Sequence, residues 1–168
     1  MITIFEGVSP PTLVVMAKVE DDLPPKAIVI QEKIPGLPAC ETPWARLMQR
    51  EVLIDFKRIL RAARLAYFAE GVYDLCGQKL SEKSLLKKVF ACLPFFSDHI
   101  IISGNKASLV DNTPEDVIQE GRRSYFKKFV IKILVAELLI DSLVVLRSGW
   151  DRLVSMCRQG DSNPQFSG

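Results

Sequence analysis

The stretch from Thr42 to Leu75 constrains the fold more than any other part of this 168-residue chain. Thr42 followed by Pro43 is typical of a helix start, because a threonine hydroxyl can cap a free backbone N–H and proline has no N–H to leave unpaired. From Met48 to Tyr67 apolar residues recur at steps of three and four, which is the period of an α-helix. We therefore predict one long helix that buries one face and ends near Gly77, where glycine can close it.

The same helix carries a row of cations. With about 100° per residue, five of them fall within a sector of roughly 60°. These residues, called the basic stripe from here on, are Arg46, Arg50, Lys57, Arg61 and Arg64. The stripe extends roughly 27 Å, enough to follow successive phosphates of a nucleic acid. A solvated amphipathic helix shows the same pattern with no partner. Leu53 and Phe68 lie in or beside the sector, where they either interrupt it or offer an apolar contact to a partner.

A second long helix is predicted to start at Thr113-Pro114 and is apolar nearly all round from Phe129 to Leu146. Three charged residues within this segment make a simple membrane span too costly. A helix without a polar face must be covered on both sides, by the rest of the chain or by a second copy, so we predict a homo-oligomer through 129–146.

Arg147-Ser148-Gly149 should break or bend the helix, and a separate short helix should follow over Trp150–Arg158, with Trp150, Leu153, Val154 and Cys157 facing inward. No heptad run long enough for a coiled coil is visible.

The remaining segments complete an α+β prediction that is predominantly helical, with two long and two short helices. Residues 1–41 form an N-terminal arm that is β-rich or merely extended, since its prolines limit regular strand pairing. Ser81–Cys92 is the other short helix, and Gly104-Asn105 should close a small β-hairpin over 99–110. The predicted organisation is therefore an arm over 1–41, a helical core domain over 42–158 and a polar tail over 159–168.

The charge of the chain is nearly balanced but unevenly placed. The net charge of +2 excludes a histone-like polycation. Residues 1–41 hold three cations and six acids, whereas residues 42–80 hold seven cations and four acids. Because screening limits each charge to about 8–10 Å, a local basic face can bind a polyanion.

The four cysteines, Cys40, Cys76, Cys92 and Cys157, have neither metal-binding nor redox spacing. Three lie in apolar helical context, which favours free thiols in a reducing, intracellular compartment. The N-terminus has no secretory signal pattern, so we predict a protein that is not secreted.

Sites for chemistry are sparse in this sequence. The single histidine, His99, could pair with a cysteine brought near it by the fold, but no cysteine occupies a context that lowers a thiol pKa. Glycine-rich phosphate-binding motifs are absent, and the acidic clusters have no histidine or cysteine companions. We therefore predict no enzyme activity, no cofactor and no metal.

Two interpretations of function remain. The first is a non-enzymatic binding protein that self-associates and uses the basic stripe to engage an acidic partner, RNA or DNA without sequence specificity being the first candidate. The second is a protein–protein interaction module, such as an effector, adaptor or inhibitor, with no role in nucleic-acid binding.

Overall fold

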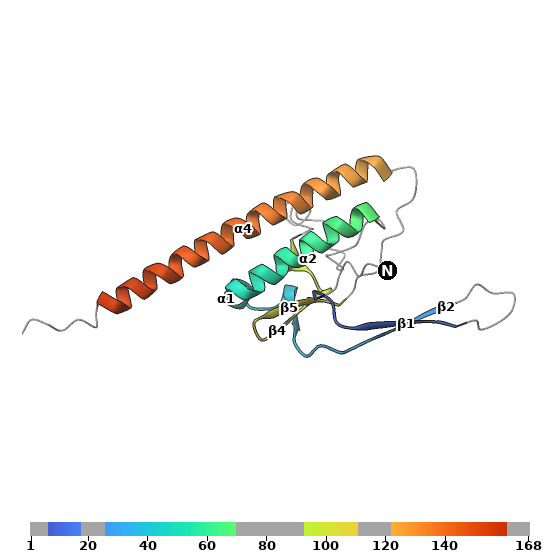
Figure 1. Cartoon of the computed structure of the whole chain (residues 1–168), viewed down its shortest axis with the longest axis horizontal. Helices are drawn as coiled ribbons and strands as arrows, with labels where there is room; N and C mark the ends of the chain where they lie inside the picture. The colour runs from blue at the N-terminus through green and yellow to red at the C-terminus, as the bar shows by residue number, and fades with distance from the viewer. Residues whose placement is uncertain (1–6, 18–25, 70–92, 111–121, 161–168) are drawn as a thin grey trace, which may run out of the picture.

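The computed structural model describes residues 7–17, 26–69, 93–110 and 122–160. These ranges confirm the predicted α+β class: two long helices dominate, and the strands form two small antiparallel sheets (Figure 1). The predicted helix over 81–92, the predicted helix end near Gly77 and the predicted start at Thr113 lie outside the described residues.

The helices are α1 (Trp44–Leu47), α2 (Arg50–Ala69) and α4 (Arg122–Gly160). The helix predicted from Thr42 is interrupted at Met48 and Gln49, and its predicted cap is wrong. The Thr42 hydroxyl donates to the Pro38 carbonyl at 2.9 Å, and no side chain caps α1. Because Thr42 is buried, its hydroxyl needs a partner within the protein, and the chain upstream supplies it.

The predicted break at Arg147-Ser148-Gly149 is also wrong, because α4 continues through these residues to Gly160. A single glycine inside a helix costs about 1 kcal/mol relative to alanine but does not by itself end the helix. The residues predicted to form a separate final helix are therefore the last turns of one 39-residue helix.

Two sheets accompany the helices. Strands β1 (Thr12–Ala17) and β2 (Lys26–Gln31) form an antiparallel hairpin within the N-terminal arm. The second sheet has the order β3-β4-β5, with β3 at Leu37–Pro38, β4 at Ile100–Ser103 and β5 at Lys106–Leu109. The turn between β4 and β5 confirms the predicted hairpin, and Gly104 supplies its positive φ of 60°. Gly36 lets β3 approach β4, since a Cβ there would lie 2.4 Å from the Ile102 carbonyl oxygen.

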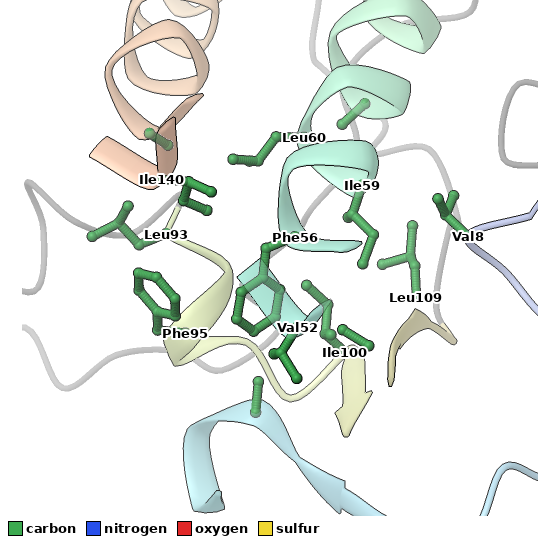
Figure 2. Packing of buried hydrophobic residues seen from close by; sticks show 14 of the residues in the cluster. Val8, Val52, Phe56, Ile59, Leu60, Leu93, Phe95, Ile100, Leu109 and Ile140 are labelled. Atoms are coloured by element: carbon green, nitrogen blue, oxygen red, sulfur yellow. The ribbon is translucent and has the colours of Figure 1, made fainter. Parts of the chain in front are cut away.

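The elements stack in three layers, with α2 between α4 on one side and the β3-β4-β5 sheet on the other (Figure 1). The core lies around α2, where Val52, Phe56 and Ile59 are fully buried. Figure 2 shows Phe56 beside Phe95, and their rings meet edge to face with centroids 5.1 Å apart. Phe95 belongs to a short 3-10 helix, η2 (Pro94–Phe96), that closes the end of this core.

Candidate functional site

Helix α4 is attached to α2 through one narrow apolar row. Ile133, Ala136 and Ile140 are buried in this contact, and Leu143 and Val144 are half-buried against the same core. The two helices run in opposite directions, side by side (Figure 1). We call residues 130–144 the attached part of α4, because no side chain described after Val144 is fully buried.

Ion pairs flank that apolar row and use two residues of the basic stripe. Lys57 pairs with Asp141, and the Arg64 Nε donates to Glu137 Oε1 at 3.1 Å. The Arg64–Glu137 pair is the more shielded, with side chains 34% and 14% exposed, and the Lys57–Asp141 pair is half-exposed. Both acids come from the charged positions that interrupt the apolar segment 129–146, so these charges join α4 to α2.

The other stripe residues have different surroundings. The Arg46 Nε donates to the Gly104 carbonyl at 3.0 Å and so joins α1 to the turn between β4 and β5. Arg50 and Arg61 are exposed, and the described part of the chain offers them neither a hydrogen bond nor an ion pair. Leu53 is 1% exposed and belongs to the core, so it offers no contact to a partner, and the side chain of Phe68 is not described. Whether the stripe binds an acidic partner stays a prediction.

The side of α4 that points away from α2 is apolar along most of its length. We call this surface the outward face. Its large side chains are between 39% and 70% exposed. They are Ile131, Leu134, Val135, Leu138, Leu139, Val145, Leu146, Trp150, Leu153 and Met156. Contiguous exposed apolar surface of this extent is uncommon on monomeric proteins.

The outward face continues beyond the attached part of α4. Residues 145–158, the projecting part, extend past α1 in Figure 1. Here the side of the helix that follows on from the α2 contact is mainly polar. Arg147, Ser148, Asp151, Ser155 and Arg158 lie along it, and Trp150 and Val154 lie at one edge. Most apolar side chains in the projecting part therefore lie on the outward side, although no tertiary contact within the described chain requires it.

The predicted inward direction of the last residues is wrong for most of them. Trp150 is 63% exposed, Leu153 is 58% exposed and Cys157 is exposed; only Val154 is half-buried. The apolar segment predicted from the sequence also ended at Leu146, whereas exposed apolar side chains continue to Met156. The signal missed in the sequence is the direction of these residues around the helix axis. In one continuous helix Leu153 and Met156 lie on the same side as Val135 and Leu138, and the predicted break at Arg147-Ser148-Gly149 hid this alignment.

Cys40 lies next to the segment that carries the single histidine, His99. The Cys40 N–H donates to the Ser97 carbonyl at 3.1 Å, which brings η1 (Ala39–Glu41) beside Asp98 and His99. Burial and the nearby negative charge of Asp98 raise the pKa of the Cys40 thiol. A nucleophilic cysteine requires a lowered thiol pKa, so the surroundings of Cys40 are the opposite of those that activate a thiol.

Neither a metal site nor a membrane-spanning helix is found among the described residues. No group of three or more histidine, cysteine or acidic side chains in these ranges is arranged to hold a metal ion. Within the same ranges no helix is long and apolar enough to cross a membrane.

No protein-family model, no curated protein and no solved structure matches this chain.

Proposed function

We propose that this protein is a non-catalytic, protein-binding scaffold that self-associates through the outward face of α4. The observation that carries the proposal is the row of ten large apolar side chains left exposed on one side of that helix. The attached part of α4 already has its other side on α2, so the second cover must come from outside the described chain.

Covering the outward face would contribute a large favourable free energy. Fully burying one large aliphatic side chain contributes about 1.5–3 kcal/mol, so covering the exposed half of each residue contributes about 1 kcal/mol. The free energy of unfolding of a whole domain is only about 5–15 kcal/mol. The free energy gained by covering ten such side chains is therefore comparable with the stability of the domain itself. Association of two copies through this face covers the exposed apolar surface of both copies at once, because an isologous contact uses the same patch on each copy.

The ion pairs favour this proposal over nucleic-acid binding. Lys57 and Arg64 are paired with acids of α4, and Arg46 is bonded to a backbone carbonyl. Cations that join two elements of one chain explain most of the basic stripe without a polyanion. Arg50 and Arg61 support a weaker second candidate, a phosphate-bearing partner held by two guanidinium groups.

The test is the mass of the chain in solution. Leu138→Glu places a charge in the middle of the outward face, where Leu138 is 67% exposed, so the fold of the single chain should survive while association is lost. Sedimentation equilibrium should give an oligomer for the native protein and a monomer for the variant, with equal helix content by circular dichroism.

Leu65→Glu is the matched control, because Leu65 is 53% exposed on α2 and lies outside the outward face. This variant should associate like the native protein. A native chain that stays monomeric up to its solubility limit would refute the proposal, as would a Leu138→Glu variant that associates normally.

A further inference from the structure

We infer that the occupant of the outward face is α4 of a second copy, running antiparallel, with the two-fold axis passing between Val145 and Leu146. This inference rests on the proposed self-association and adds its direction and register. It is carried by three observations on the described residues: the spacing of the face, the placement of its small residues and the charges along its edges.

The centre of the outward face has a palindromic spacing. Between positions 135 and 156 the line facing directly away from α2 consists of Val135, Leu138, Ser142, the Val145–Leu146 pair, Gly149, Leu153 and Met156, and Ile131 continues it toward the N-terminal end of α4. Reading from the centre, the steps are the same in both directions. An antiparallel partner therefore sets Leu138 against Leu153 and Val135 against Met156, with each apolar residue opposite another over roughly 32 Å.

Ser142 and Gly149 are the small residues of this line, and they lie opposite each other in the same register. The Ser142 hydroxyl donates to the Leu138 carbonyl at 2.9 Å, so it can enter an apolar contact without an unpaired hydrogen-bonding group. A Cβ added at Gly149 would meet nothing within 4 Å, so nothing in the described chain requires glycine there. A closely approaching second helix gives that glycine a packing reason.

Charges along α4 favour the antiparallel direction over the parallel one. The attached part carries one cation and two acids, whereas the projecting part carries three cations and one acid. Because Glu137 and Asp141 are already paired with Arg64 and Lys57, the cations of the projecting part dominate the remaining charge, and antiparallel pairing places those of the two copies at opposite ends of the contact. In this register Arg152 lies on the same edge of the contact as Asp141 of the other copy, within two residues of direct opposition, and Asp141 is half-exposed in its pair with Lys57. Parallel pairing would bring like charges to the same level instead.

Disulfide cross-linking tests the direction. In the inferred register residue 135 lies one residue from direct opposition to the native, exposed Cys157 of the other copy. Val135→Cys, oxidised gently at low concentration, should give a covalent dimer whose tryptic peptides link position 135 to Cys157. Ser155→Cys on the polar side of the projecting part is the control and should give no link through position 155.

Each outcome decides between the two claims. Links joining 135 to 135 and Cys157 to Cys157 would show a parallel pair and overturn the inference while leaving self-association intact. A native oligomer that yields no link through position 135 would also overturn the inference alone. A monomer that yields no links would overturn both claims, because the face would then have no second copy on it.

Discussion

The charged side chains of α1 and α2 have different partners, although they look alike in the sequence. Arg46, Lys57 and Arg64 all belong to the basic stripe, yet Arg46 binds a turn carbonyl whereas Lys57 and Arg64 bind different acids of α4. Asp55 has an equally specific role: its Oδ2 accepts the Ala107 N–H at 3.1 Å, and its Oδ1 accepts from Arg58 at the same distance. The carboxylate therefore joins α2 to β5, which its place on a helical wheel does not indicate.

Cys40 allows a prediction about pH. Burial first, and the charge of Asp98 second, raise the pKa of its thiol, so alkylation of Cys40 in the folded protein should reach half its maximal rate at a higher pH than in denaturant. Asp98→Asn removes the second cause and should move that midpoint downward. Peptide mapping after iodoacetamide labelling across a pH series measures both.

The same shift has a consequence for stability. The thiol ionises more readily in the unfolded chain, so this group's contribution to folding should become unfavourable as pH rises through the ordinary thiol pKa. Equal midpoints for folded and denatured protein, or an upward movement in Asp98→Asn, would contradict the assignment.

At the scale of the element, α4 is one helix with two apolar sides that serve different contacts. Its inward row, Ile133, Ala136 and Ile140, belongs to the core, and Figure 2 shows Ile140 close to Leu60 and Leu93. Its outward row is exposed. Two apolar rows on one helix give a single hydrophobic segment in the sequence, and only packing separates them.

This separation predicts opposite concentration dependence for two substitutions. Ile140→Ala opens a cavity in the core, since Ile140 is 0% exposed, and should lower the free energy of unfolding by about 2–5 kcal/mol at every protein concentration. Leu138→Ala should have almost no effect in dilute protein and should lower stability only where the chains associate. Urea unfolding at two concentrations measures the difference, and a large loss for Leu138→Ala in dilute protein would show that its exposure is wrongly assigned.

At the scale of the whole molecule, the free part of the basic surface is small. Arg50 and Arg61 are the stripe residues left without a partner within the described chain. Two phosphate contacts predict a slope of about −1.8 when the logarithm of the binding constant for duplex DNA is plotted against that of salt concentration, whereas five contacts predict about −4.5.

We expect the shallower slope for each copy, and its loss in the Arg50→Ala, Arg61→Ala double variant. Arg58→Ala is the control, because Arg58 is 65% exposed on the same helix but paired with Asp55. A slope near −4.5, or an equal loss in Arg58→Ala, would mean that binding uses a different surface from the one described.

The sequence by itself determined the local elements. Periods of three and four residues identified α2 and the apolar length of α4, and Gly104-Asn105 identified the hairpin of β4 and β5, because these signals depend on neighbours along the chain. The interruption at Met48 and Gln49 and the continuity through Gly149 could not be read in the same way, because local propensities for stopping or continuing a helix differ by only about 1 kcal/mol.

Only the tertiary structure decided how the two helices are used. Glu137 and Asp141 are partners of Arg64 and Lys57 because the antiparallel packing of α4 on α2 brings together residues more than 70 positions apart. The same packing divides the apolar side chains of α4 into a buried row and an outward row. Hydrophobicity dictates that a side chain leave water, whereas long-range packing determines which surface covers it.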